Sequence, residues 1–370
     1  QHDRPRGFQH DRPRGLNCGS DAVALPNVGK PELSHSIPAF CNARQGTKTD
    51  AAITIGKLRL PLADENRNRM TAERNNLVDF AETISALESP QVWQYETWLV
   101  GSCADVTLET FESLQRPADL PPMDAAIVAG DRVALAVDPN VPSLVEVLNG
   151  AIKAVGHTDA SALEIVLWDE ASDDLVDQIT AAVGDGIEVY RHQPADRSSL
   201  RYLGASQSAD PIYLNRHLVD ADFVLPIVSG RPLDTCFVHD LTGVFPWCAD
   251  SRSRARHRAQ VAGGDEASLE SLDSIQQTSW LLGVQIMLAV TASDSGQVAQ
   301  VIAGTPDSLR KALTPARRLP DGFPPSAPLV VASLDGGAQQ QSWANAARAI
   351  SAARRFTQAG GPIVRGSDRQ

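Results

Sequence analysis

The clearest pattern of apolar and polar positions lies in the middle of the chain. Residues 132–138 form a short apolar run that ends in the carboxylate of Asp138, which is typical of a buried parallel strand. Residues 144–155 then place apolar side chains at helical spacing, with Ser143 as the expected N-cap and Gly156 as the expected stop. This pair of elements predicts the beginning of an α/β fold.

The alternation of strands and helices continues along the chain. Such alternation predicts crossover connections and a parallel sheet with helices on both faces. Ligands bind such sheets at the carboxyl ends of the strands, so we expect the functional residues in the segments after residues 138, 168 and 228. The expected elements are strands at 162–168, 186–190, 222–228, 284–290, 298–303, 329–332 and 362–364, and helices at 172–183, 272–282, 305 onward and 343–358.

Two segments of the second half carry more detailed expectations. Residues 249–268 are rich in Ser, Asp, Arg and Gly, which predicts an exposed connection, with an anion site formed by its arginines as the alternative. Residues 292–296 have the composition of a hairpin turn. The helix at 343–358, closed by Gly360, is expected to bury one apolar face made of Trp343, Ala347, Ile350, Ala353 and Phe356.

The amino-terminal part reads differently. The heptapeptide QHDRPRG occupies residues 1–7 and recurs at residues 9–15, and so short a repeat cannot bury a core. It is a solvated tail or a mis-assigned start, or alternatively an arm that binds metal or phosphate through its histidines. After it, residues 53–60 alternate well enough for an edge strand, and residues 75–87 predict an amphipathic helix.

Together these patterns predict a two-domain α/β protein with parallel or mixed sheets, covering helices and an interdomain cleft. We expect a disordered tail over residues 1–48 and a first α/β domain over 49–268. A smaller C-terminal α/β domain follows over 269–370, and the abrupt end of the chain makes truncation one explanation for its size.

Composition narrows the class of partner. Acidic residues outnumber basic ones by 45 to 33, and the net charge of −12 argues against binding nucleic acid phosphates. The sequence shows neither a run of about 18 apolar residues nor the pattern of a secretory signal, so we expect neither a membrane span nor export. Five scattered cysteines without a CxxC pair indicate reduced thiols in a cytoplasmic protein and no zinc site.

Several segments together resemble the nickel-pincer lactate racemase family, over roughly residues 115–364. The similarity rests on the order and spacing of Tyr202-Leu-Gly204, Pro211 to Arg216, Asp220 to Pro226, the hairpin region 283–306 and the loop and helix from Ser333 to Val364. The resemblance implies a nickel-carrying, NAD-like nucleotide that is attached to a lysine and held between two domains. It further implies two histidines that exchange the α-proton of a 2-hydroxy acid.

The chain departs from that pattern at the positions that carry the chemistry. His239 and Gly243 match the start of the motif with the second histidine, but Ala249 stands at the position of the cofactor-holding lysine. The segment that corresponds to the first histidine is Val166 to Ser172, which contains neither histidine nor arginine. His257 is the candidate for the nickel-ligating histidine. The cofactor is therefore unknown.

Each candidate residue has a functional interpretation and a purely structural one. His239 is a general base or metal ligand, or a hydrogen-bonded loop histidine. Asp169, with its neighbour Glu170, is an acid/base group or a solvated carboxylate. Asp138 contacts a cofactor or caps the following helix.

The remaining candidates concern ligand binding. Arg231 binds a substrate carboxylate or forms an exposed salt bridge. Gly336 and Gly337 precede a helix and could form an anion cradle, or serve a connection that needs a positive φ. Gly243, four positions after His239, is a candidate cofactor contact.

Two functions compete on this basis. The first is a 2-hydroxy-acid racemase or epimerase, an isomerase, which rests on the resemblance alone. The second is a divergent relative that binds a small anionic molecule or a nucleotide in the cleft without the pincer cofactor, which the missing lysine and histidine favour. A truncated product is the third alternative.

Overall fold

The structure is a computed structural model that describes residues 51–55, 91–95, 102–206, 209–230, 243–262, 274–293, 297–313, 326–334, 339–354 and 356–367. All of them belong to one compact unit, Thr49–Gln370. The predicted tail over residues 1–48 and the predicted helix at 75–87 lie outside the described residues.

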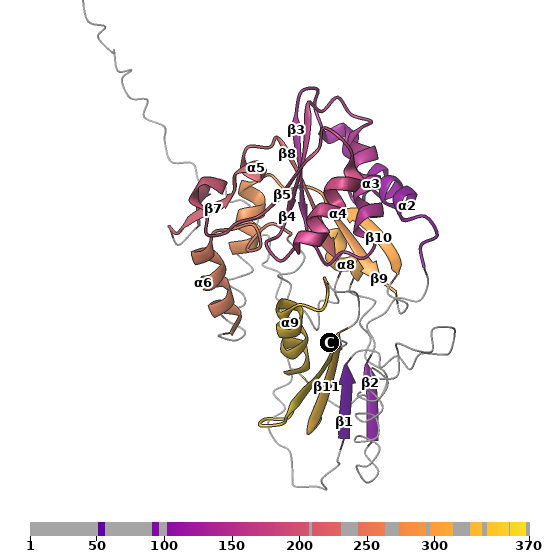
Figure 1. The fold of residues 1–370 in the computed structure, drawn as a ribbon, viewed down its shortest axis with the longest axis vertical. Helices are drawn as coiled ribbons and strands as arrows, with labels where there is room; N and C mark the ends of the chain where they lie inside the picture. The colour runs from indigo at the N-terminus through magenta and orange to yellow at the C-terminus, as the bar shows by residue number, and fades with distance from the viewer. Residues whose placement is uncertain are drawn as a thin grey trace, which may run out of the picture. The chain divides into compact units, whose positions relative to one another are not determined.

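The larger sheet has six strands in the order β10-β9-β8-β3-β4-β5. All neighbours pair in parallel except β10, which returns antiparallel to β9 as the predicted hairpin (Figure 1). An α/β fold with a mostly parallel sheet is therefore confirmed. The strands are β3 Arg132–Val137, β4 Ala162–Leu167, β5 Glu188–Arg191, β8 Phe223–Ser229, β9 Met287–Ala292 and β10 Val298–Gly304.

Helices cover this sheet on both faces. Alternate residues of β3 accordingly belong to two different apolar clusters, one on each face. Val133 and Leu135 pack with α2 Val106–Gln115, α3 Leu144–Val155 and α4 Asp173–Val183. Ala134 and Ala136 belong to the opposite cluster, which includes residues of α5 Arg216–Val219, α8 Pro306–Leu313 and the helix at 274–281. The pleat of a strand predicts this division, and burial on both faces explains why β3 is apolar throughout.

The second sheet has four parallel strands in the order β12-β11-β1-β2. Helix α9, Trp343–Arg354, connects β11 to β12 and packs on them through Ala353, while Phe356 just after it joins the same cluster. Strand β1 lies between β11 and β2, so the predicted edge strand is an inner strand. The bounds are β1 Ala51–Ile55, β2 Gln91–Tyr95, β11 Leu329–Leu334 and β12 Ile363–Ser367.

Sheet membership crosses the predicted domain boundary at residues 268/269. Strands β9 and β10 come after it but extend the sheet of β3 and β8, whereas β1 and β2 come before it but pair with β11 and with each other. Apolar periodicity locates a strand without identifying its partner, so the sequence could not assign these strands to a sheet.

The predicted exposed connection at 249–268 is wrong for its first half, which forms helix α6, Ser251–Ala262. The Asp250 carboxylate caps it by accepting hydrogen bonds from the backbone N–H groups of Arg252 (2.8 Å) and Ser253 (2.9 Å). The helix was missed because its buried side chains, which include Arg254 and His257, are polar. A search for apolar periodicity cannot detect such a face.

The predicted buried face of α9 is also largely wrong. Trp343 is 79% exposed and Ile350 44% exposed, whereas the buried positions on the helix are Asn345, Ala346, Ala352 and Ala353. The buried stripe is made mainly of alanines, whose small apolar signal was outweighed by the larger side chains.

Smaller elements complete the described fold. Strands β6, Leu200–Ala205, and β7, Pro211–Asn215, form an antiparallel hairpin, and two short 3₁₀ turns lie at Met123–Ala126 and Arg197–Ser199. Ser143 precedes α3 as predicted, but it has a φ of 49° and its side chain makes no capping hydrogen bond. Among the described residues, we find no helix that is long and apolar enough to cross a bilayer.

Candidate functional site

The carboxyl ends of three neighbouring strands of the six-stranded sheet carry polar side chains. Asp138 follows β3, Asp169 and Glu170 follow β4 after one tryptophan, and Ser229 ends β8. Between β3 and β8 the strand order reverses, because β3 leads through α3 to β4 on one side while β8 lies on the other. Such a switch point is where open α/β sheets hold their ligands.

Asp138 bridges this switch point from a fully buried position. Its Oδ1 accepts hydrogen bonds from the backbone N–H of Asn140 (2.8 Å) and from Asn140 Nδ2 (2.9 Å), and its Oδ2 accepts from the N–H of Ser229 (3.3 Å). The carboxylate therefore fixes the loop after β3 against the end of β8. Its predicted contact with a cofactor stays a prediction.

Two arginines that are distant in sequence meet the carboxylates after β4. Arg254, from α6, forms an ion pair with Asp169 through Nη1 and Oδ2, and its side chain is only 6% exposed. Arg348, from α9, meets Glu170 with two parallel hydrogen bonds, Nη1 to Oε2 at 3.0 Å and Nη2 to Oε1 at 2.9 Å. The bidentate geometry is the strongest form of this pair.

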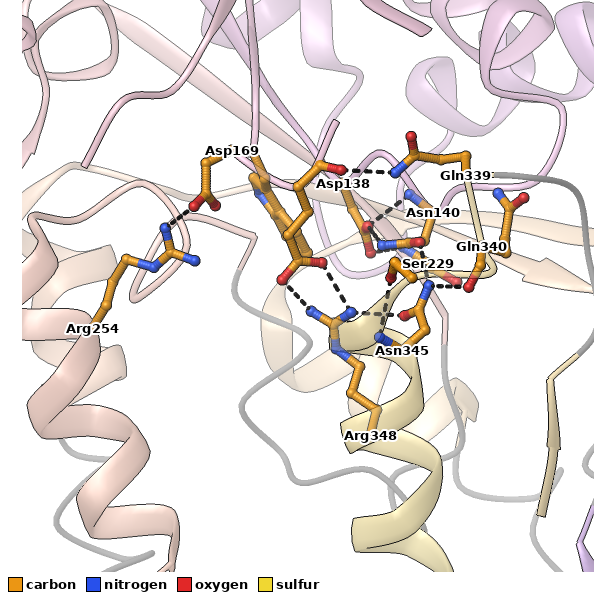
Figure 2. A network of polar contacts seen from close by, with 12 residues as sticks. Asp138, Asn140, Asp169, Ser229, Arg254, Gln339, Gln340, Asn345 and Arg348 are labelled. Atoms are coloured by element: carbon orange, nitrogen blue, oxygen red, sulfur yellow. Dashed lines mark hydrogen bonds and ion pairs between the residues drawn. The ribbon is translucent and has the colours of Figure 1, made fainter. Parts of the chain in front are cut away.

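The amino end of α9 adds amide contacts to the same edge (Figure 2). The Gln339 side chain accepts from the N–H of Ser172 (3.0 Å) and donates to the carbonyl of Glu170 (3.0 Å). Asn345 Nδ2 donates to Asn140 Oδ1 at 2.7 Å. Since α9 follows the carboxyl end of β11, these contacts join the carboxyl edges of the two sheets. We call the set of Asp138, Asn140, Asp169, Glu170, Arg254, Gln339, Asn345 and Arg348 the carboxyl-edge network.

Aromatic rings border this network. Trp168 is stacked on Trp247 with ring centroids 4.9 Å apart, and the Arg348 guanidinium lies 4.8 Å from the Trp247 ring centroid. Trp168 Nε1 donates to the carbonyl of Gly243 at 2.9 Å. Gly243 has a φ of 65°, and a Cβ there would lie 2.7 Å from Pro226 Cβ, so packing alone requires glycine at this position. Its predicted cofactor contact stays untested.

Two of the described histidines, His192 and His257, are buried. His257 is buried on α6, with its ring centroid 6.2 Å from that of Phe245. His192, which the sequence analysis did not single out, is hydrogen-bonded to the Ala249 carbonyl (3.0 Å) and to Asn215 Nδ2 (3.3 Å). Burial lowers the pKa of the His192 imidazole below its ordinary value, against the opposing effect of the Ala249 hydrogen bond. Within the described ranges, no three His, Cys, Asp or Glu side chains are grouped to hold a metal ion.

The structure thus brings some predicted residues together and leaves others undescribed. Asp138 and Asp169 both belong to the carboxyl-edge network, and His239, Arg231, Gly336 and Gly337 lie outside the described residues. Arg348 was not predicted, and Arg254 was predicted only as one of the arginines of residues 249–268 that formed the alternative anion site. Neither has a local signal, since one lies in an arginine-rich segment and the other on the polar side of an alanine-rich helix.

The similarity to one solved structure supports the fold. The structure is similar to the lactate racemase apoprotein from Thermoanaerobacterium thermosaccharolyticum, with a TM-score of 0.51 and 12% identity over 73% of this chain and 70% of that one. A Thermotoga maritima protein matches with a TM-score of 0.41 and 11% identity over 57% of each chain. No family model matches the sequence. No curated protein matches it either. At such identities the similarity to lactate racemase shows a distant fold relationship alone.

Proposed function

We propose that this chain is a lactate-racemase-like protein that binds a small anionic molecule or a nucleotide at the carboxyl-edge network, without the nickel-pincer chemistry. One observation carries the proposal. The carboxylates of Asp169 and Glu170, where the family resemblance puts the first catalytic histidine, are each paired with an arginine.

Such pairing is unfavourable for proton abstraction. Both carboxylate oxygens of Glu170 accept hydrogen bonds from Arg348, so proton abstraction by Glu170 would weaken a bidentate charge pair. Asp169 is held by Arg254 through Oδ2, and its Oδ1, which has no hydrogen-bond partner among the described residues, is buried. A base for a carbon acid needs a free lone pair within hydrogen-bond reach of that carbon. This arrangement supports ligand binding over racemisation.

The residues present do not fit a lysine-tethered nickel nucleotide. The position that corresponds to the lysine is Ala249, whose side chain is buried and whose carbonyl accepts a hydrogen bond from His192. No lysine occurs between Lys153 and Lys311. A methyl group cannot form the covalent attachment, so we derive no step through this cofactor.

The arginines support an anionic ligand. A guanidinium is planar, always charged and matched to carboxylate or phosphate oxygens, and Arg254 donates a hydrogen bond from one nitrogen, Nη1, to Asp169. The network is also incomplete. Within or beside the network, Asp169 Oδ1, Trp247 Nε1 and Gln341 Oε1 are buried without a hydrogen-bond partner in the described part of the chain, and of these three atoms the indole nitrogen could donate to an anion.

A thermal-shift titration tests the proposal. NAD⁺, lactate and inorganic phosphate would each be titrated at constant ionic strength, and at least one should raise the melting temperature in a saturable way. Arg254→Gln should lose this rise, whereas Arg354→Gln, which changes an exposed arginine at the end of α9, should keep it. A flat response to all three compounds contradicts the proposal.

The second candidate function is 2-hydroxy-acid racemisation, which the fold relationship and the His239–Gly243 spacing favour. Protein expressed together with the cofactor-making enzymes would be examined for bound nickel and for interconversion of lactate enantiomers. We expect neither. Nickel at one equivalent together with racemisation would replace the binding function by the enzymatic one.

We further propose a cytoplasmic location and no nucleic acid partner. Both proposals rest on composition: five cysteines without a CxxC pair, and a net charge of −12. Burial raises the pKa of the Cys248 thiol, which keeps this thiol protonated and poorly reactive. Retention of free thiols in protein isolated under non-reducing conditions checks the first proposal.

A further inference from the structure

The contact between Glu170 and Arg348 has the geometry of a bound ligand. The carboxylate meets the guanidinium edge-on, with one oxygen on each terminal nitrogen at 2.9 and 3.0 Å. A substrate carboxylate or a phosphate makes the same two-point contact with an arginine. Glu170 therefore occupies the position on Arg348 that an external anion would take.

Arg348 is held ready for such an exchange by contacts other than Glu170. Its Nη1 also donates to Asn345 Oδ1 at 2.7 Å, and its guanidinium lies over the Trp247 ring. The guanidinium would keep these two contacts if the carboxylate left. A preorganised arginine loses little conformational entropy when a ligand binds it.

The burial of Arg348 sets the free-energy cost of leaving its guanidinium without a negative partner. The side chains of Arg348 and Glu170 are 15% and 12% exposed. A guanidinium that far from water is costly without a compensating negative charge. Removal of the Glu170 carboxylate leaves this charge uncompensated, so an external anion should then bind Arg348 more tightly.

We infer that Glu170 is an internal competitor, which occupies the anion position of Arg348 and is exchanged for the ligand carboxylate or phosphate. This inference rests on the proposed anion-binding function and adds its regulation: ligand affinity is set by how easily Glu170 leaves. The pair also joins the strand end after β4 to α9, so exchange releases one of the contacts between the edges of the two sheets.

Glu170→Gln tests the inference, since it keeps the size of the side chain and removes the charge. The dissociation constants of inorganic phosphate and lactate would be measured by calorimetry at fixed ionic strength. We expect at least a tenfold decrease in the dissociation constant for one of them, together with a lower melting temperature in the absence of anion. The anion whose dissociation constant decreases shows whether the site binds phosphate or a carboxylate.

Glu164→Gln is the matched control. Glu164 lies on β4, the strand that precedes Glu170, is 17% exposed and pairs with Arg132 at 3.1 Å and with His217 at 3.0 Å, but it is not at the carboxyl edge. Its loss should leave anion affinity unchanged. Adding Arg348→Gln to Glu170→Gln should abolish the gain, because the arginine that holds the anion is then gone.

The outcomes separate this inference from the proposed function. Equal affinity in the wild-type protein and Glu170→Gln overturns the inference and leaves the binding function intact. Lack of binding by both proteins overturns the function and the inference with it. Should Glu170→Gln fail to fold, Glu170→Asp takes its place, because its shorter side chain cannot keep both hydrogen bonds and should still lower the dissociation constant several-fold.

Discussion

Asn345 and Asn140 are hydrogen-bonded through their side chains although 205 positions separate them. The first stands in α9 beside the four-stranded sheet, and the second follows β3 of the six-stranded sheet. Asn140 is itself fixed by Asp138, and Asn345 by Arg348 and by the Gln340 carbonyl. One amide pair thus connects two otherwise separate sets of hydrogen bonds.

Asn345→Ala should therefore lower the free energy of unfolding by about 1 to 3 kcal/mol, because it leaves the buried Oδ1 of Asn140 without this donor. Urea denaturation followed by circular dichroism measures the change. Ala347→Ser, at an exposed position on the same helix, should change it by less than about 0.5 kcal/mol. Similar effects of both substitutions would mean that the amide pair is not coupled to stability.

Asp169→Asn should destabilise the fold by about 2 kcal/mol, because Arg254 is buried and loses its charge partner. The figure is below that for a fully buried pair since Asp169 is partly exposed. A double-mutant cycle with Arg254→Met isolates the coupling free energy. A coupling near zero would show that the ion pair contributes nothing beyond packing.

Gly243→Ala should cost more than about 2 kcal/mol, because its Cβ would lie 2.7 Å from Pro226 Cβ and 2.8 Å from Val228 Cγ1. Gly283→Ala provides the control, since its φ of 74° is similarly unfavourable for alanine but no atom lies within 4 Å of the added Cβ. The control should cost only about 1 kcal/mol. Equal melting temperatures for the two variants would remove the packing argument.

Stability should fall as the pH drops below about 6.5, because the pKa of His192 is lowered in the folded state from that ordinary value. The unfolded chain then binds a proton that the folded chain does not, which favours unfolding until the pH reaches the folded-state pKa. Above pH 7 both states are neutral at this group and its contribution is constant.

His192→Gln should flatten this dependence. Unfolding free energies at pH 8, 7, 6 and 5.5 would be compared with those of the wild-type protein, within a range where carboxylates of ordinary pKa titrate little. His157→Gln, at an exposed position, serves as the control. A slope that persists in His192→Gln would assign the pH dependence to another group.

The sequence predicted those elements whose apolar pattern reports burial directly. Strand β3 and helix α3 were located to within a residue because their buried positions are apolar. Helix α6 was not, since its buried face contains Arg254 and His257. The carboxylates of the site were predicted from their place at strand ends, whereas Arg254 and Arg348 are recognisable only once the fold brings them to those carboxylates.

The order of strands in the smaller sheet has a consequence for folding. Strand β1 pairs with β11, which lies 277 positions later in the sequence (Ala52 with Leu329), whereas all strands of the larger sheet lie between residues 132 and 304. The larger sheet can therefore assemble before the ribosome has made β11. The pairing of β1 with β11 can form only after β11 has been made, and closing so long a loop is slow. Until β11 has been made, β1 can pair only with β2, so the edge of β1 that later binds β11 is open to other strands.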